Sequence, residues 1–332
     1  MTARRLAALG IALTFPGLAA AAEVDGSRLS VWWAVPFVGI LLSIALWPLF
    51  APRFWHHHFG KISAAWALLF LVPFAALFGF DLAGQSFVHA LLAEYVPFIL
   101  LLTALFTVAG GIHVSGNIKG APAVNTAILA VGTVLASFMG TTGASMLLIR
   151  PLIRANDNRR HQAHVVVFFI FLVSNVGGSL TPLGDPPLFL GFLKGVDFFW
   201  TMKSIFPETL FMAVTLLVIF YLLDSWLYRK EGVLPLDPTP PTDPPLGIQG
   251  KANFALLGVV VALVLMSGVW KSSVEFDIWG THVGLPGLVR DLGLIVVTFV
   301  SLAITSRQVH EDNQFNWGPM AEVARLFAGI FL

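Results

Sequence analysis

Five polar residues stand close together inside one of the most apolar parts of this chain. Within SNVGGSLTPLGDPPLFLGF, residues 174–192, four of them offer hydroxyl or amide oxygens and the fifth is a carboxylate: Ser174, Asn175, Ser179, Thr181 and Asp185. The apolar runs VVVFFIFLV and LFLGFL flank them. Such oxygens are hard ligands that suit Na⁺ rather than a soft metal, and an ionisable residue at membrane depth points to function. The pattern therefore predicts a cation site inside a membrane.

This stretch cannot continue the helix that its apolar flanks predict over residues 164–196. Prolines lack an amide hydrogen and crowd the preceding turn, and glycines weaken a helix. The middle of the stretch, residues 177–187, has three of each: Pro182, Pro186, Pro187, Gly177, Gly178 and Gly184. Irregular backbone in a bilayer is tolerated only where protein or a water-filled cavity surrounds it, and secondary transporters build midplane sites from such broken helices. A proline-kinked helix with an interhelical hydrogen bond is the simpler alternative, but a kink needs only one proline.

A second segment, residues 121–154, is longer than the ~20 residues that one helical crossing needs. Lys119 precedes it and several arginines follow it, so the excess of positive charge in cytoplasmic loops puts both its ends on one side of the membrane. Its middle, ASFMGTTGAS, sets glycines around Thr141 and Thr142. These features predict a re-entrant helical hairpin with a Gly/Thr tip. One long tilted helix, with small residues for packing, is the alternative.

Composition indicates the class of protein. The chain of 332 residues is 57% hydrophobic and 11% charged, whereas a soluble domain carries about a quarter charged residues. We therefore expect an all-α polytopic membrane protein with the lipid bilayer as its main partner. A net charge of +1 without a basic stripe gives no indication of nucleic-acid binding, and the lack of cysteine excludes thiol chemistry. No HExxH, GxSxG or GxxxxGKS/T pattern occurs, which argues against an enzyme or an ATP-driven pump.

The remaining segments complete the expected organisation. Residues 1–22 are typical of a secretory signal peptide, with Arg4 and Arg5 ahead of a short apolar core; a short first helix or an uncleaved anchor is the alternative. Residues 29–230 should form a first transmembrane half, 231–251 a proline-rich cytoplasmic linker, and 252–332 the start of a second half. We expect APRFWHHHFGK, residues 51–61, to be an interfacial loop, and Arg290 to lie in an outer loop.

Two motifs, GTTGASMLLIRP at the hairpin tip and SNVGGSLTPLGDPP at the helix break, together resemble the ion transporter superfamily. That group includes NhaD-type sodium:proton antiporters, arsenite permeases, and citrate and dicarboxylate carriers. The likeness is greatest to the branch of citrate transporters and sodium:proton antiporters, and it covers essentially the whole mature chain. It implies an inverted-repeat secondary transporter, as a homodimer, in which each half contributes a hairpin tip and a broken helix. Because this chain ends before the second pair, we expect it to be C-terminally truncated, with an incomplete site.

The resemblance also implies which residues bind the ion or substrate. We take those that match the two motifs, with Ser137 just before the tip: Ser137, Thr141, Thr142, Gly143, Ser174, Asn175, Gly177, Gly178, Thr181, Gly184 and Asp185. Antiporters of this group often have Asp-Asn at the tip, where this chain has Thr141-Thr142. The carboxylate that exchanges its proton would then be Asp185, or would lie in the missing part.

The favoured function is sodium:proton antiport in a bacterial-type inner membrane. The hypothesised Na⁺ ligands are Thr141, Thr142, Asn175, Thr181 and Asp185. A lone carboxylate in low dielectric resists ionisation, so Na⁺ binding would release a proton from Asp185; no cofactor is expected besides the ions Na⁺ and H⁺. Na⁺- or H⁺-coupled transport of citrate or another dicarboxylate, a small organic anion, is the alternative. The lack of an obvious intramembrane Lys or Arg, apart from Arg150 at the inner end of the hairpin, counts against it.

Overall fold

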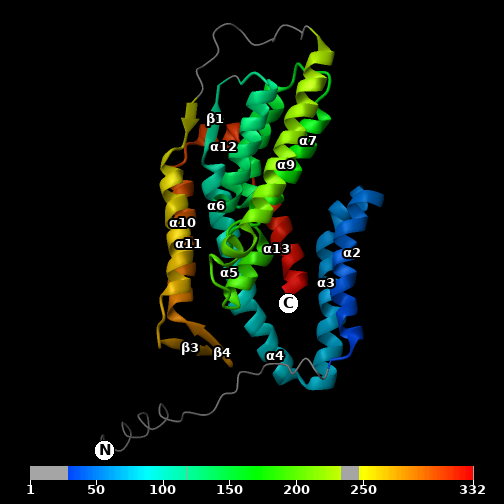
Figure 1. Cartoon of the computed structure of the whole chain (residues 1–332). Helices are drawn as coiled ribbons and strands as arrows, with labels where there is room; N and C mark the ends of the chain where they lie inside the picture. Colours follow the sequence, from blue (N-terminus) through cyan, green and yellow to red (C-terminus); the bar gives the residue numbers. More distant parts are fainter. Residues whose placement is uncertain (1–28, 117, 233–246, 332) are drawn as a thin grey trace, which may run out of the picture. The chain divides into compact units, whose positions relative to one another are not determined.

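The computed structural model describes residues 29–116, 118–232 and 247–331, which divide into two compact units (Figure 1). The first unit contains residues 29–93, 275–283 and 325–331, and the second contains the other described residues from 94 to 324. The signal peptide expected over residues 1–22, and most of the linker expected over 231–251, lie outside the described residues.

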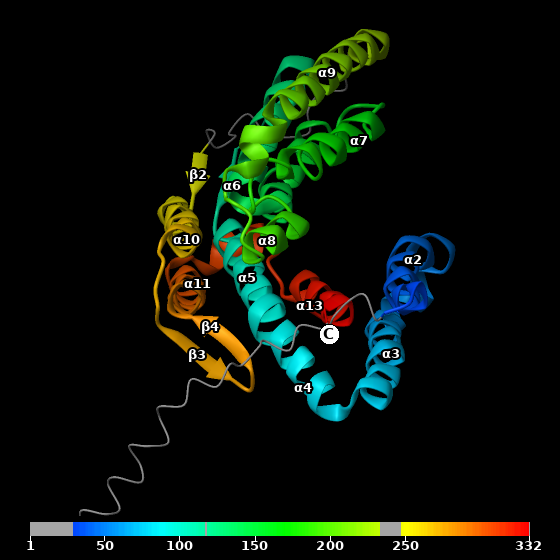
Figure 2. The same cartoon turned by 60° about the horizontal axis from the view of Figure 1, so that its bottom comes forward.

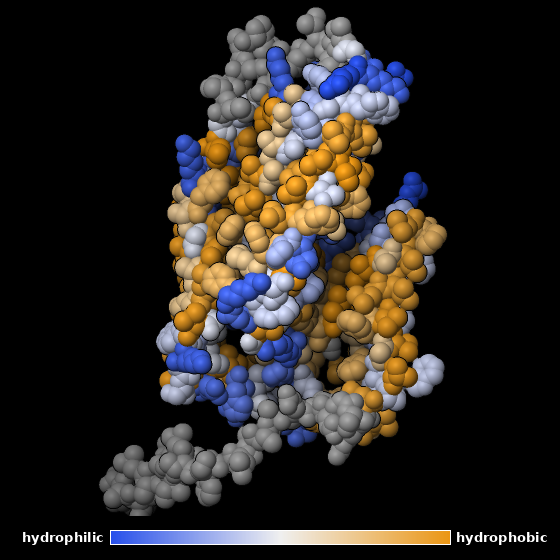
Figure 3. All heavy atoms as spheres, viewed as in Figure 1, coloured by the Kyte–Doolittle hydropathy of each residue, from blue (hydrophilic) through white to orange (hydrophobic). Residues whose placement is uncertain are grey.

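Seven helical segments of the described chain are long and apolar enough to cross a bilayer. They are Val31–Phe50, Pro52–Phe78, Phe80–Gly110, Pro122–Ala155, Trp200–Glu231, Ala252–Val269 and Leu285–Ile304. The prediction of an all-α polytopic membrane protein is therefore confirmed. Figure 3 shows hydrophobic side chains along α9 (Trp200–Glu231) and hydrophilic ones at its C-terminal end, the pattern expected of a helix that leaves the hydrocarbon core there.

The first unit is built on two long helices, α2 (Val35–Phe50) and α3 (Pro52–Phe78), which lie side by side (Figures 1 and 2). Trp66 of α3 fills the space that Gly39 of α2 leaves open, because a Cβ there would lie 2.4 Å from the indole ring. The Trp66 Nε1 also donates to the Ser43 hydroxyl at 3.1 Å. The other elements of this unit are η3 (Val31–Ala34), α4 (Phe80–His89), β3 (Glu275–Ile278), β4 (Thr281–Gly284, with Gly284 in the second unit) and the end of α13 (Gly318–Phe331).

Residues 52–61 are helical, so the prediction of an interfacial loop over residues 51–61 was wrong. α3 begins at Pro52, and proline is well suited to the first turn of a helix. The 27 residues of α3 extend about 40 Å, more than the ~30 Å hydrocarbon core. The histidines and basic residues can therefore sit at the bilayer edge without ending the helix, while the buried rings of Trp55 and Phe59 pack 6.2 Å apart on its other face.

The second unit surrounds α5 (Val96–Gly110), which has ten buried residues. The π-helical turn η4 (Ala90–Tyr95) leads into α5, and α5 packs against α6 (Pro122–Ala155), α10 (Ala252–Val269) and α11 (Leu285–Ile304). Figures 1 and 2 both show α10 and α11 side by side. The remaining elements of this unit are β1 (His113–Ser115), α7 (Ala163–Leu172), η5 (Val176–Gly178), α8 (Pro186–Leu193), α9, β2 (Gly247–Gln249), α12 (Arg307–Asp312) and most of α13.

Late parts of the chain cap the C-terminus of α5. The last carbonyls of a helix have no partner within it, and here two buried asparagines supply the missing donors. The Asn313 Nδ2 donates to the carbonyls of Gly110 and Ile112, at 2.8 Å each, and the Asn253 Nδ2 donates to that of Gly111 at 2.9 Å. Just beyond, β1 pairs antiparallel with β2, so the last part of the expected linker forms a strand. These bonds hold the first and second halves of the sequence together within this unit.

Arg290 lies within α11, not in the outer loop that was predicted for it. The helix begins at Leu285, with Pro286 in its first turn, and Arg290 is only 5% exposed. Its Nε donates to Asp291 Oδ1 at 2.7 Å, and its guanidinium carbon lies 5.7 Å from the centre of the Phe189 ring. The prediction failed because a charged side chain that is ion-paired and stacked on an aromatic ring in this way can be buried within a long apolar helix.

Candidate ion-binding site

The long helix α6 is folded back on itself at Gly140. A straight helix of 34 residues would be about 50 Å long, yet its two ends are joined by hydrogen bonds. The Asn125 Nδ2 donates to Asn156 Oδ1 at 2.8 Å, and the Gly120 amide donates to the Ala155 carbonyl at 2.7 Å. Gly140 has a φ of 76° and a ψ of 154°, a conformation that is essentially restricted to glycine. The segment is a helical hairpin, and the Thr141-Thr142 pair follows its hinge directly.

The predicted helix break is present between α7 and α8. α7 ends at Leu172 and α8 begins at Pro186, with only the short 3-10 turn η5 and bends between them. Pro186 and Pro187 occupy the first turn of α8, where their missing amide hydrogens leave no intrahelical bond unmade. Asp185 is the N-cap residue of α8, but its side chain makes no capping hydrogen bond.

The hairpin hinge and the helix break contact each other through their backbones. The Thr141 amide donates to the Gly184 carbonyl at 3.1 Å, and the Ser137 hydroxyl donates to the Gly177 carbonyl at 2.6 Å. The buried Thr181 hydroxyl donates to the Ser137 carbonyl and accepts a hydrogen bond from the Leu183 amide. These side chains satisfy backbone groups that the broken helix and the hairpin hinge leave without partners, which is the condition for irregular backbone inside a membrane.

Glycine is required at two positions of this contact because backbones approach closely there. A Cβ on Gly184 would lie 2.2 Å from the Gly178 carbonyl oxygen, and one on Gly177 would lie 2.5 Å from the Thr133 carbonyl oxygen. Both distances are well inside van der Waals contact, so a side chain on Gly177 would push the break away from α6, and a side chain on Gly184 would force apart two parts of the break itself. The sequence predicted these glycines as part of a site, and the structure gives them a packing role.

The hypothesised sodium ligands differ in whether their oxygens are already engaged. Thr181 is buried and its hydroxyl is occupied by the two bonds given above. Thr142, Asn175 and Asp185 are exposed, and within the described residues neither the Thr142 hydroxyl nor the Asp185 carboxylate makes a hydrogen bond. The Asn175 Nδ2 donates to the Ile170 carbonyl at 2.8 Å, which leaves its amide oxygen open. No hydrogen bond joins these three side chains to one another in the described part of the chain.

The other predicted site residues hold the break in place. The hydroxyls of Ser174 and Ser145 are 2.9 Å apart, which ties the start of the break to the return arm of the hairpin. The Ser179 hydroxyl lies 3.1 Å from that of Thr209 on α9. Gly143 packs against α5, since a Cβ on it would lie 3.0 Å from the Ala109 Cβ. These contacts support the junction.

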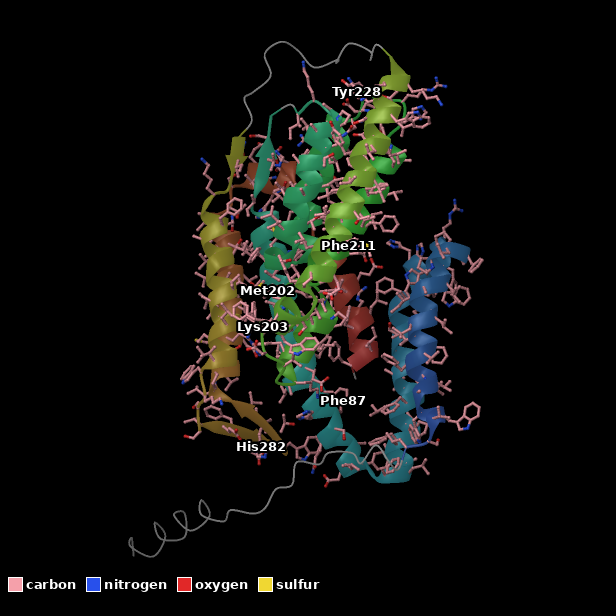
Figure 4. All side chains as sticks on the ribbon, in the orientation of Figure 1. Phe87, Met202, Lys203, Phe211, Tyr228 and His282 are labelled. Atoms are coloured by element: carbon pink, nitrogen blue, oxygen red, sulfur yellow. The ribbon has the colours of Figure 1, made fainter. Side chains whose placement is uncertain are left out.

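A buried polar network, which was not predicted from the sequence, closes the end of the hairpin that is opposite its hinge. Asp224 of α9 is fully buried; it forms an ion pair with Arg159 Nη1 at 2.6 Å and accepts a hydrogen bond from Asn125 Nδ2 at 2.9 Å. The His164 Nε2 lies 2.8 Å from its carboxylate. Arg159 also donates to Glu231 at 3.2 Å, and its guanidinium carbon lies 5.1 Å from the centre of the Tyr228 ring, which Figure 4 labels near the end of α9.

This network joins three elements that position the site. Asn125 lies on the first arm of α6, His164 lies at the start of the broken helix, and Asp224 lies on α9. The criterion that singled out Asp185 also predicts it: an acidic residue inside an apolar helix is expected to have a specific role or partner. Asp224 stands in the run TLLVIFYLLDSW and meets that criterion.

A helical membrane protein in which a hairpin meets a broken helix has the architecture from which secondary transporters build their ion and substrate sites. Fold and site together define a membrane transporter. The chain belongs to the family described as putative citrate transport, whose family model matches residues 26–332. The predicted resemblance to the citrate-transporter branch is thereby confirmed. No curated protein and no solved structure matches the chain.

Proposed function

We propose that this chain is a sodium:proton antiporter of a bacterial-type inner membrane, with its cation site where the hairpin hinge meets the helix break. The observation that carries the proposal is the carboxylate of Asp185, which makes no hydrogen bond or ion pair within the described residues. Asp185 is next to Gly184, whose carbonyl accepts a hydrogen bond from the Thr141 amide. Asp185 is the only ionisable residue between Leu172 and Lys194. A single carboxylate with nearby hydroxyl and amide oxygens suits one small hard cation.

Exchange follows from competition at one carboxylate. A proton and a Na⁺ ion both neutralise Asp185, and at membrane depth the charged carboxylate without either is costly. Binding of Na⁺ from one side then releases the proton, and the reverse happens on the other side. The open oxygens of Thr142 and Asn175 would complete the coordination of the cation. The engaged hydroxyl of Thr181 acts instead by fixing the backbone of the break.

The test is Na⁺-driven proton movement in inside-out membrane vesicles that contain the chain. Addition of Na⁺ should dissipate an imposed pH gradient with the native chain, and Asp185→Asn should abolish the response because the exchange group no longer titrates. Asp197→Asn is the matched control, because Asp197 lies outside the break and pairs with Lys203 at the surface at 3.4 Å. An Asp185→Asn response equal to that of the native chain would overturn the proposal.

A second candidate is Na⁺- or H⁺-coupled transport of citrate or another dicarboxylate. The description of the family supports this candidate. Arg290 supports it too, because the sequence had given no obvious intramembrane cation to pair with a dicarboxylate. Arg290 is buried in a helix that is long enough to span the bilayer, and it contacts α8 through Phe189. Uptake of radiolabelled citrate under a Na⁺ gradient, lost in Arg290→Gln and partly kept in Arg290→Lys, would favour this candidate. Na⁺-driven pH change without citrate uptake would favour antiport.

A further inference from the structure

The first unit contains a cavity of about 700 Å³ among α3, α4 and the end of α13. One part of its wall is basic, with His56, Lys61 and Arg325, and the rest is mostly apolar, including Leu71 of α3 and Phe87 of α4, which Figure 4 labels. No carboxylate is among the described residues that line it. The cavity therefore combines a positively charged region with an apolar wall.

Among the described residues, the two charged residues of this cavity have no acidic partner. Within the described chain neither Lys61 nor Arg325 forms an ion pair, and both are exposed. The Arg325 guanidinium carbon lies 5.9 Å from the centre of the Phe59 ring, which directs its side chain back across α3. Two cations with neither an ion-pair partner nor a lining carboxylate among the described residues favour an anionic occupant.

Two smaller apolar cavities adjoin the large one. One, of about 230 Å³, shares Ala67 and Gly329 with it, and the other, of about 190 Å³, shares Leu71 and Phe87. Aromatic and aliphatic residues make up most of their walls. A basic region with two apolar cavities beside it matches an anionic headgroup with two acyl chains.

The position of the basic residues along α3 agrees with this occupant. Lys61 is the tenth residue of α3, about 14 Å from the start of the helix. Since α3 is some 10 Å longer than the hydrocarbon core, a basic side chain in its first turns can reach the headgroup region. Basic pockets between transmembrane helices are known binding sites for anionic lipid headgroups. We propose that this cavity binds an anionic phospholipid, with its phosphate between Lys61 and Arg325 and its acyl chains in the apolar branches.

The experiment measures lipid binding to the full chain in mild detergent, by native mass spectrometry with added phosphatidylglycerol or phosphatidylcholine. The native chain should bind phosphatidylglycerol preferentially. One basic residue near a membrane surface contributes about fivefold in affinity for anionic lipid, so the double variant Lys61→Gln, Arg325→Gln should bind it about 25-fold more weakly. The double variant Lys203→Gln, Arg307→Gln is the matched control, since it removes the same charge from exposed sites elsewhere.

A second variant tests the apolar branches separately. Ala67→Trp should fill the junction of two cavities and weaken phosphatidylglycerol binding while both basic residues stay in place, and excess inorganic phosphate should not displace the lipid. Equal binding of the two lipids, or equal losses in the two charge variants, would overturn the proposal. Displacement by phosphate together with an unaffected Ala67→Trp variant would show that the site binds small anions and not a lipid.

Discussion

Asp224→Asn should destabilise the second unit strongly, because Asp224 holds together the open end of the hairpin. The substitution keeps the size of the side chain but removes the charge that pairs with buried Arg159 at 2.6 Å. It also replaces one accepting oxygen by an NH2 group, which cannot accept the hydrogen bonds that the carboxylate receives, such as the one from Asn125 Nδ2 to Asp224 Oδ2 at 2.9 Å.

The expected loss is at the lower end of the range for a broken buried ion pair. Removing one partner of such a pair costs about 3–5 kcal/mol, and Arg159 keeps Glu231 as a second partner at 3.2 Å. We therefore expect a loss of about 3 kcal/mol in the free energy of unfolding, which corresponds to roughly 6–12 °C in melting temperature for a unit of this size. Tryptophan fluorescence during heating in mild detergent measures it.

Two comparisons make this prediction specific. Asp197→Asn breaks a pair whose side chains are 73% and 61% exposed, and such pairs contribute about 0–1 kcal/mol, so its melting temperature should change little. The double variant Asp224→Asn, Arg159→Gln should lose less than the sum of the two single variants, because the lone buried charge is gone. Additive losses, or a melting temperature for Asp224→Asn equal to that of Asp197→Asn, would refute the role of Asp224 in holding the hairpin ends together.

Three further changes test the hinge, the junction and a half-buried histidine. Gly140→Ala should cost about 1–3 kcal/mol of stability, because the φ and ψ of Gly140 suit only glycine. Gly258→Ala in α10, where a Cβ would meet nothing within 4 Å, should instead gain up to ~1 kcal/mol. Denaturant titration measures both changes. Thr181→Val should cost about 1–3 kcal/mol in the same assay, because two buried backbone groups lose their partner. Burial lowers the pKa of His310, so the unfolded chain binds more protons than the folded chain below about pH 6.5. The stability that neutral His310 contributes is therefore present above that pH and is lost as pH falls through the lowered pKa. His310→Phe should therefore flatten the fall in melting temperature on acidification, while His282→Phe, at an exposed position, should not.

Each of these expectations has an outcome that contradicts it. Equal effects of alanine at Gly140 and Gly258 would mean that the hinge is not strained. An undiminished stability of Thr181→Val would mean that its hydroxyl does not support the break. The same pH dependence in His310→Phe as in the native chain would mean that another group causes it.

The helix break and the hairpin were predictable because their causes are local in sequence. Three prolines and three glycines within one stretch prevent a helix whatever surrounds them, and positive charge at both ends of residues 121–154 already indicated a turn inside. The choice of Gly140 as the hinge was not predictable, since Gly143 lies in the same motif and only the backbone angles distinguish them.

The features that were missed depend on partners far away in sequence. Asp224 pairs with Arg159 across more than sixty residues, and no pattern along the chain links them. Arg290 was assigned to a loop because its partner on another helix, Phe189, could not be known. The strand pairing of residues 113–115 with 247–249 was hidden for the same reason. The roles of Thr142, Asn175 and Asp185 in ion binding stay predictions.

The most direct test of the central claim is equilibrium binding of radiolabelled Na⁺ to the purified chain in mild detergent, at several pH values. A cation site at the junction of hinge and break predicts saturable binding that weakens on acidification and is lost in Asp185→Asn, while Asp197→Asn binds as the native chain does. Saturable, pH-dependent Na⁺ binding that survives in Asp185→Asn would contradict the account.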